Sequence, residues 1–281
     1  MWRFTKTRNE SLYIPRRFED KITNHLLKNR LLKDYGQSLI LAIQGSPGDG
    51  KTTQTFESCK RADYSVIRID ASDCSGKHEG DADAYLKEQH EQALVQHKNG
   101  VNVAIVIDDL DMSVAGTANK REYTVNSQLL SVALMEFCDV KPENGTRVPI
   151  FVTGNDLTTI HKPLMRHGRS ELFTWCPTQQ EKFDVVKTML LDVCGKDSIV
   201  WSLIKSFSDQ PISFFSSLRS DAVDQILAKY DCRKLLEQHR DEIQRIIDSE
   251  LGHGDGRMLL ELANQRSTRI TTNFLNTEID S

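Results

Sequence analysis

Residues 39–52 read LILAIQGSPGDGKT, an apolar run followed by a glycine-rich turn, a lysine and a threonine. The part from Gly45 to Thr52 fits the pattern G-x-x-x-x-G-K-[ST], which requires a strand before it and a helix after it. Glycines let backbone N–H groups converge on phosphate oxygens, and the first turn of a helix adds partial positive charge. A chance glycine-rich turn is the alternative, but the flanking pattern favours a phosphate-binding loop.

The chemistry of this loop indicates its cofactors, ATP and Mg²⁺. Lys51 is expected to reach the β and γ phosphates, and Thr52 is expected to supply a hydroxyl to the metal. The residues expected to contact the nucleotide are Gly45, Ser46, Pro47, Gly48, Asp49, Gly50, Lys51, Thr52 and Thr53.

Outward from the loop, short apolar runs alternate with helical patterns as far as residue 177. The apolar runs cover residues 39–44, 65–70, 101–108, 148–153 and 172–175, and the helical patterns cover residues 52–61, 83–97 and 127–138. This alternation predicts an α/β fold in which a P-loop parallel sheet is sandwiched by helices.

Beyond residue 177 apolar residues recur at helical spacing only. The helical patterns cover residues 179–194, 197–207, 212–229, 233–248 and 257–268, and Thr178 stands where a helix N-cap is expected. The sequence thus predicts three parts. They are a short N-terminal segment with the first helix (1–30), an α/β nucleotide-binding domain (31–177) and a small all-helical lid domain (178–281).

Composition excludes several other classes of protein. The 281 residues are 38% hydrophobic and 27% charged, with 36 basic residues against 40 acidic ones, which is typical of a folded globular chain and lacks an obvious nucleic-acid footprint. The apolar runs are far shorter than the roughly 20 residues of a membrane span, and the first residues lack a signal-peptide pattern. Six scattered cysteines without C-x-x-C spacing favour neither disulfides nor zinc. We therefore expect a cytoplasmic protein without a membrane partner, for which nucleic acid is an unlikely partner.

Two carboxylates follow the third apolar run. Asp108 and Asp109 stand directly after a run that reads as a strand buried on both faces. Adjacent aspartates there are costly unless they face a polar cleft, and the carboxyl edge of a parallel sheet is where ligands bind. We expect Asp108 to hold the magnesium shell and Asp109 to orient the attacking water. A solvated turn at the end of the strand is the alternative.

Four further polar residues complete a pattern. Asn155 follows the next strand, Arg166 and Arg169 stand three apart after it, and Arg219 lies in the helical region. Alone, such an asparagine indicates a turn, and surface arginines are usually solvated. Together with the loop and the aspartates, they resemble the AAA+ ATPases. That resemblance implies that Asn155 is a sensor of the γ phosphate, that Arg166 and Arg169 are arginine fingers directed at a neighbouring subunit's ATP, and that Arg219 is a second sensor in the lid.

A more specific resemblance covers most of the chain from about residue 12. The segment TGNDLTTIHKPLMRHGRSELFTWCPT (153–178) resembles the Rubisco activases. Similar stretches follow the same order: LYIPRRFEDKITNHLLKN (12–29), IDDLD (107–111), EYTVNSQLLSVALM (122–135), RVPIFVTGND (147–156) and DQPISFFSSLRS (209–220). Only about a dozen residues precede the match, as in the green or cyanobacterial type that lacks the long N-terminal region.

The resemblance implies an AAA+ ATPase that couples ATP hydrolysis to remodelling of a client protein in a homo-oligomeric ring, a hexamer. The client is Rubisco or another protein. Tyr13 and Ile14 fall where the adenine pocket begins, and residues 72–80 and 113–121 correspond to segments facing the central pore. Lys77, His78, Lys120 and Arg121 are the candidates for client contact.

Two alternatives stay open. One is a nucleic-acid-associated or phage-defence AAA+ ATPase. The other is a non-hydrolysing nucleotide switch, because position 109 carries aspartate where most AAA+ proteins have glutamate.

Overall fold

The computed structural model describes residues 12–31, 36–70, 81–110, 120–139, 147–159, 164, 166, 168–236, 238–252 and 256–275. It divides into two compact units. One unit runs from Arg16 to Cys176, and the other contains the chain from Pro177 onward together with the residues that precede Arg16.

The first unit is built on a five-stranded parallel sheet with the strand order β2-β3-β4-β1-β5. Its strands are β1 (Ile40–Gln44), β2 (Ser65–Asp70), β3 (Val103–Asp108), β4 (Ile150–Gly154) and β5 (Ser170–Thr174). Its helices are α1 (Arg16–Arg30), α2 (Lys51–Arg61), α3 (Asp81–Lys98) and α4 (Lys120–Asp139), with a 3-10 turn, η1 (Leu157–Thr159), after β4.

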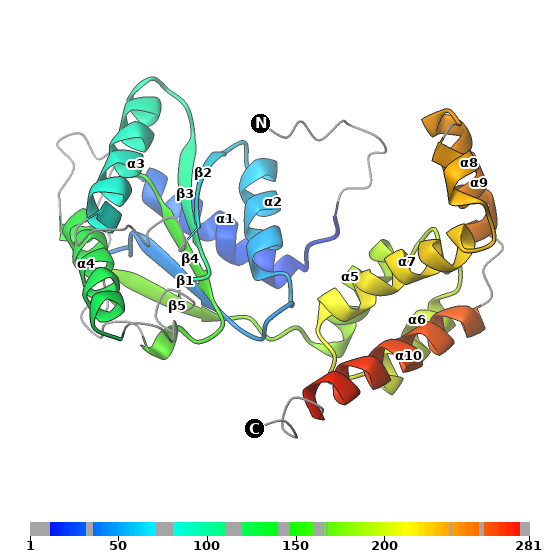
Figure 1. Ribbon diagram of the computed structural model, residues 1–281. Helices are drawn as coiled ribbons and strands as arrows, with labels where there is room; N and C mark the ends of the chain where they lie inside the picture. Colours follow the sequence, from blue (N-terminus) through cyan, green and yellow to red (C-terminus); the bar gives the residue numbers. More distant parts are fainter. Residues whose placement is uncertain are drawn as a thin grey trace. The chain divides into compact units, whose positions relative to one another are not determined.

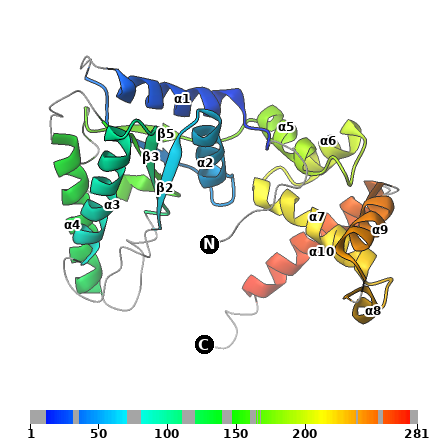
Figure 2. The same ribbon diagram turned by 90° about the horizontal axis from the view of Figure 1, so that it is seen from above.

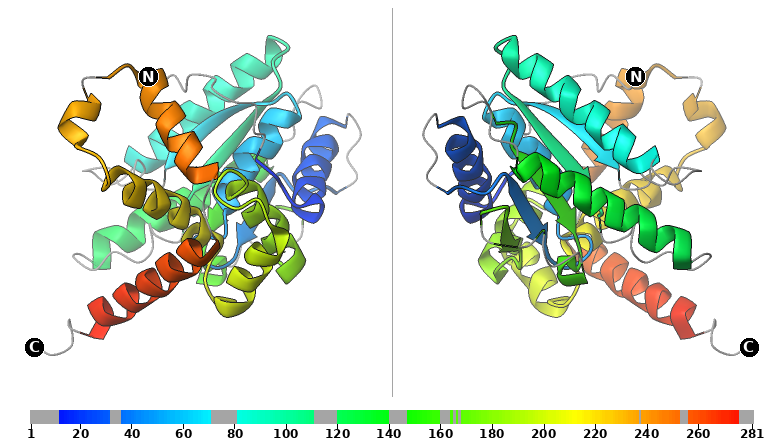
Figure 3. Two further views of the ribbon diagram at one scale, coloured as in Figure 1. Left: turned by 90° about the vertical axis from the view of Figure 1, so that its right-hand side faces the viewer. Right: turned by 90° about the vertical axis from the view of Figure 1, so that its left-hand side faces the viewer.

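Helices cover both faces of this sheet (Figure 1). α1 packs against α2 on one face and α3 against α4 on the other, and the right-hand view of Figure 3 shows α3 and α4 in front of the strands. Every residue of β3 is buried, as a strand covered on both faces requires. The predicted fold, a parallel sheet sandwiched by helices and followed by a helical region, is confirmed.

The second unit is helical in the part that the structure describes (Figure 2). Its helices are α5 (Gln179–Met189), α6 (Asp197–Ser206), α7 (Ile212–Leu227), α8 (Cys232–Leu236), α9 (Arg240–Gly252) and α10 (Gly256–Leu275). Thr178 caps α5 as predicted: its hydroxyl accepts from the N–H of Glu181, whose carboxylate accepts from the N–H of Thr178. The core includes Phe215 and Leu218, which are fully buried.

The elements differ from the sequence prediction in one main respect. The single helix expected over residues 233–248 is wrong, because the chain forms α8 and α9 there. α9 begins with Asp241 and Glu242 in its first turn, where negative charge stabilises the helix start. None of the helices described is long and apolar enough to cross a bilayer.

Candidate nucleotide-binding site

The predicted site residues of the first unit lie where β1, β3 and β4 end. The glycine-rich loop follows β1 at Gln44, Asp108 ends β3, and Asn155 follows β4. Because the three strands are parallel neighbours, their carboxyl ends share one edge of the sheet. Ligands of open α/β sheets bind at that edge.

Lys51 connects the loop to the end of β4. Its ammonium donates to the carbonyls of Gly45 at 2.8 Å and Ser46 at 2.9 Å, and to Oδ1 of Asn155 at 3.1 Å. The residue is only 5% exposed. The structure thus brings together two residues that the sequence assigns to the phosphates from positions far apart in the chain.

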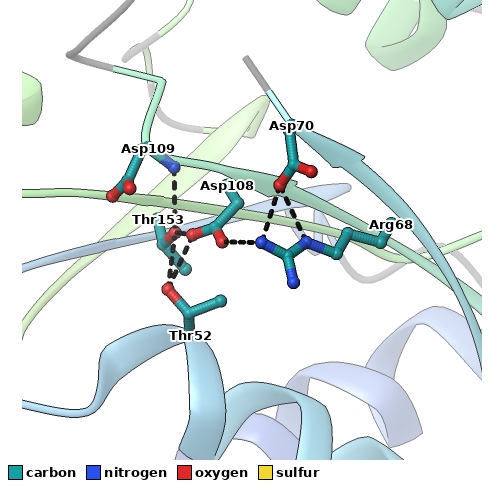
Figure 4. A network of polar contacts seen from close by, with 6 residues as sticks. All are labelled: Thr52, Arg68, Asp70, Asp108, Asp109 and Thr153. Carbon is teal, nitrogen blue, oxygen red and sulfur yellow. Dashed lines mark hydrogen bonds and ion pairs between the residues drawn. The ribbon is translucent and has the colours of Figure 1, made fainter. Parts of the chain in front are cut away.

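Asp108 is held by two hydroxyls (Figure 4). Its Oδ1 accepts from Oγ1 of Thr52 and from Oγ1 of Thr153, both at 2.6 Å. The pairing of Thr52 with Asp108, predicted as the metal pair, is therefore present. Hydroxyl and carboxylate oxygens are ligand types that Mg²⁺ takes, so the donor set fits this metal.

The other oxygen of Asp108 faces an arginine that the sequence analysis missed. Nη2 of Arg68 lies 3.0 Å from Oδ2 of Asp108 and 2.7 Å from Oδ1 of Asp70. The available signal was a charged residue within the strand sequence SVIRID. Its contact with Asp108 could not be derived without knowing that β2 lies beside β3.

Thr153 was missed as well, although it belongs to the TGND segment. Besides its bond to Asp108, its hydroxyl accepts from the backbone N–H of Asp109 at 3.3 Å, and its carbonyl accepts from Leu110 at 3.0 Å. One threonine of β4 thereby fixes the turn that carries both aspartates.

Asp109 has a positive φ of 51°. This left-handed conformation is uncommon for residues other than glycine, although aspartate and asparagine tolerate it better than most. Figure 4 shows its carboxylate directed away from the contacts between Asp108 and Thr52, and Asp109 joins this network through its backbone N–H, which donates to Thr153.

Trp175 packs against the glycine-rich loop. It is a third residue that the sequence analysis did not single out. A Cβ on Gly45 would lie 2.1 Å from the Trp175 carbonyl oxygen, so only glycine fits there. The Trp175 indole donates to the carbonyl of Asp49 at 3.0 Å, and its ring meets Phe18 edge to face at 5.0 Å. Gly48 and Gly50 have φ of 79° and 76°, which glycine adopts without strain.

The predicted arginine fingers lie elsewhere. The carbonyl of Arg169 accepts from the N–H of Ile40, the first residue of β1, so Arg169 is at the amino edge of the sheet, opposite the loop. Its guanidinium forms two bonds to Asp139, at 2.6 and 3.1 Å. Arg166 is exposed.

Arg219 lies on α7 in the helical unit, where its guanidinium forms an ion pair with Asp192. Tyr13 and Ile14 precede α1, the first half-exposed and the second buried. In the loop, Ser46, Pro47, Gly48 and Thr53 are exposed and Asp49 is buried. Residues 72–80 and 113–119 lie outside the described part of the chain, as do the side chains of Lys120 and Arg121.

The fold and the loop first define a class. A parallel sheet whose first strand leads through G-x-x-x-x-G-K-T into a helix is a P-loop nucleotide-binding domain. Residues 41–178 match the family described as "ATPase family associated with various cellular activities (AAA)". The chain therefore contains an AAA ATPase domain, and its curated relatives show that this domain is homologous to the Rubisco activases.

Two such relatives are chloroplastic ribulose bisphosphate carboxylase/oxygenase activases. The one from Arabidopsis thaliana is 31% identical over 79% of this chain and 49% of its own length. Activase A from Hordeum vulgare is 32% identical over 78% of this chain and 49% of its own length. The chain thus spans about half the length of these relatives. The expected resemblance is confirmed.

A solved structure agrees on the fold. The crystal structure of the FIGL-1 AAA domain in complex with ADP superposes with a TM-score of 0.61 at 13% identity, over 86% of this chain and 77% of that one.

Proposed function

We propose that this chain binds and hydrolyses ATP and uses the energy to remodel a partner protein from within a homo-oligomer. The convergence of Lys51, Thr52 and Asp108 at the carboxyl edge of the sheet carries this proposal. The homology to Rubisco activases supports a protein client, either Rubisco or another protein, and a hexameric ring. The cytoplasmic location of the protein stays a prediction. The boundaries of its three predicted parts, after residues 30 and 177, also stay predictions.

In the proposed mechanism, the loop N–H groups and Lys51 bind the phosphates. The Lys51 ammonium already lies among backbone carbonyls of the loop, so phosphate oxygens would replace those acceptors over a short movement. Mg²⁺, when bound, would neutralise charge on the β and γ phosphates, and Thr52 and Asp108 would hold it. Asn155, which accepts a hydrogen bond from Lys51, would sense the γ phosphate, and this bond supports the proposal.

Asp109 is the proposed orienter of the attacking water. Its backbone N–H donates to Thr153, and in the proposed mechanism a rotation of its side chain would turn the carboxylate toward the edge. Asp109→Asn should therefore bind ATP and fail to hydrolyse it, because an amide cannot polarise water in the same way. Phosphate release and ATP binding, measured on the same preparation, test this. Wild-type hydrolysis by Asp109→Asn would refute the role.

The position of Arg169 supports a role in trans. It lies at the edge of the sheet opposite its own loop, so its guanidinium would contact ATP bound to a neighbouring subunit instead of its own. The exposed Arg166 would do the same. Arg219 has Asp192 as its partner within the helical unit, and γ phosphate would compete with that carboxylate. Both roles remain proposals.

Assembly and client are tested separately. ATP with Mg²⁺ should increase the sedimentation coefficient, because a nucleotide that binds between subunits favours the assembled form by mass action. A chain that stays monomeric at roughly tens of micromolar, with a slowly hydrolysed ATP analogue present, would contradict the ring. Co-purification from the native host should recover a client protein that stimulates phosphate release. Stimulation by DNA alone would favour the nucleic-acid alternative.

A further inference from the structure

We infer that Arg68 is a positioning residue that acts as the counter-ion of Asp108 and sets the Mg²⁺ concentration at which the site takes up nucleotide. The inference rests on the proposed nucleotide site. It adds a residue that neither the loop motif nor the aspartate pair contains.

The position of Arg68 follows from strand register. β2 and β3 are parallel neighbours in which Arg68 pairs with Val106 and Asp70 pairs with Asp108. Arg68 and Asp70 are two residues apart, so both side chains leave the same face of β2. The guanidinium lies between the two carboxylates, and Nε also donates to Asp70 at 2.8 Å (Figure 4). The ring of Phe56, centred 5.5 Å from Cζ, holds the guanidinium from α2.

Charge explains why an arginine is needed there. The side chain of Asp108 is 8% exposed, and a buried carboxylate is costly without a cation or several hydrogen bonds. Asp70 brings a second carboxylate to the neighbouring strand position, where like charges repel. Among the residues that the structure describes, Arg68 is the cation that contacts Asp108. It therefore neutralises a pair of acids that would otherwise attract a divalent metal strongly.

Thr52 and Arg68 contact different oxygens of the same carboxylate, so a metal held by Thr52 and Asp108 would leave the Arg68 contact in place. Oδ1 of Asp108 faces Thr52, the metal side, whereas Oδ2 faces Arg68. The two cations are thus compatible in space but repel each other, and Arg68 lowers the affinity for Mg²⁺. Asp70 moderates this repulsion, because it shares the charge of Arg68.

This arrangement predicts opposite effects for two neighbouring substitutions. Arg68→Met keeps a long side chain beside Phe56 and removes the positive charge, so it should lower the Mg²⁺ concentration for half-maximal ATP binding about five- to tenfold. Asp70→Asn removes the carboxylate that shares the charge of Arg68. Arg68 should then repel Mg²⁺ more strongly, so the Mg²⁺ concentration for half-maximal ATP binding should rise. A purely structural role would instead weaken binding in both variants at every Mg²⁺ concentration.

The experiment titrates MgCl2 against the protein and a fluorescent ATP analogue, and follows binding by anisotropy. A second series uses MgCl2 alone and follows the melting temperature, so it needs neither nucleotide nor hydrolysis. Arg68→Met should gain more thermal stability from MgCl2 than the wild type does. Lys60→Met, which removes an exposed positive charge on α2, is the matched control and should behave like the wild type.

Unchanged Mg²⁺ midpoints in Arg68→Met, or shifts of both variants in one direction, would overturn the inference. If Arg68→Met fails to fold, Asp70→Asn and Arg68→Lys still test it, since Arg68→Lys keeps the charge and should keep a midpoint near that of the wild type. A wild type that binds no ATP would refute the proposed function instead. The series with MgCl2 alone would then still decide the role of Arg68.

Discussion

The two edges of the parallel sheet are held together in different ways. At the carboxyl edge, Thr52 and Thr153 from separate segments bond to the side chain of Asp108, and Lys51 bonds to two carbonyls of the loop as well as to the side chain of Asn155. At the amino edge, two buried side chains of α1 bond to backbone carbonyls before β1: His25 contacts the carbonyl of Leu39 at 3.1 Å, and Asn29 donates to that of Ser38 at 3.1 Å. The partly exposed Arg169, at the same edge, pairs with the side chain of Asp139. Side chains can exchange partners by rotating, whereas backbone carbonyls of a sheet cannot. The side chains around Asp108 are therefore suited to ligand binding, and the contacts of α1 at the amino edge to stability.

Of the substitutions that test this contrast, Lys51→Ala at the carboxyl edge should have the largest effect. The substitution removes the cation that we propose binds the phosphates, so ATP binding and hydrolysis should both be lost while the protein stays folded. Isothermal titration with ATP and circular dichroism measure the two outcomes. Lys182→Ala is the matched control, because Lys182 also donates to two backbone carbonyls, those of Ser208 and Gln210, in the helical unit. If both variants lost ATP binding, the assay would be reporting a loss of folded protein, and the phosphate-binding role of Lys51 would lose its support.

Arg169→Lys should leave ATP binding nearly normal and reduce hydrolysis roughly a thousandfold, if the finger acts as in other NTPases. Lysine cannot reproduce a bidentate guanidinium contact to phosphate. Steady-state phosphate release measures the loss, and Arg266→Lys, which disrupts a bidentate pair with Asp221, is the control.

Mixing gives the sharper version of this test. Arg169→Ala and Lys51→Ala should each be inactive alone and regain activity together, because a mixed ring contains some complete composite sites. Proven co-assembly without activity would place the arginine in cis or require every site to be intact. A titration of the wild type with each variant separates those two cases.

Acid should destabilise the fold through the buried His25 at the amino edge. Burial lowers the pKa of His25 from 6.5 to about 4, so the unfolded chain binds the proton more readily than the folded one. The free energy of unfolding should therefore fall by about 3 kcal/mol as the pH drops from 6.5 to 4, and this contribution should be fully present above pH 6.5. Urea denaturation of the wild type and of His25→Gln measures it as the difference between the two pH profiles. The exposed His239 offers the control, His239→Gln, and an identical slope in all three proteins would refute the assignment.

Thr153→Val should give the smallest effect, a loss of about 10- to 100-fold in hydrolysis or metal affinity, because a neighbour that orients a ligand has been removed. The variant keeps the shape of the side chain but leaves Asp108 and the N–H of Asp109 without its hydroxyl. Phosphate release at several Mg²⁺ concentrations tests it. Thr188→Val, which removes a hydroxyl bonded within α5, should change neither quantity.

The sequence predicted the carboxyl edge better than the amino edge, for a physical reason. Local patterns alone predicted that Asp108 ends a strand and that Lys51 begins the helix after the loop, and the structure has both there. Their ligand roles stay predictions. The contact of Arg68 depends on which strand lies beside β2, and that of Trp175 depends on the packing of a residue 126 positions from its partner Asp49. Arg169 and its partner Asp139 are 30 residues apart, so their contact is not contained in a local pattern either. Such contacts arise from tertiary packing, which periodicity and motif spacing do not contain.

The order of the strands also has a consequence for how the protein is made. β1, the strand that carries the loop, lies between β4 and β5, and Gln44 at its end bonds to Thr174, which is 130 residues later in the chain. Pairings this distant in sequence carry a large loop-closure entropy and slow the folding of a domain. On a ribosome, the glycine-rich loop would leave the exit tunnel long before either neighbouring strand exists. In the nascent chain, β1 therefore has no neighbouring strand until β4 has been synthesised, and its second neighbour follows only with β5.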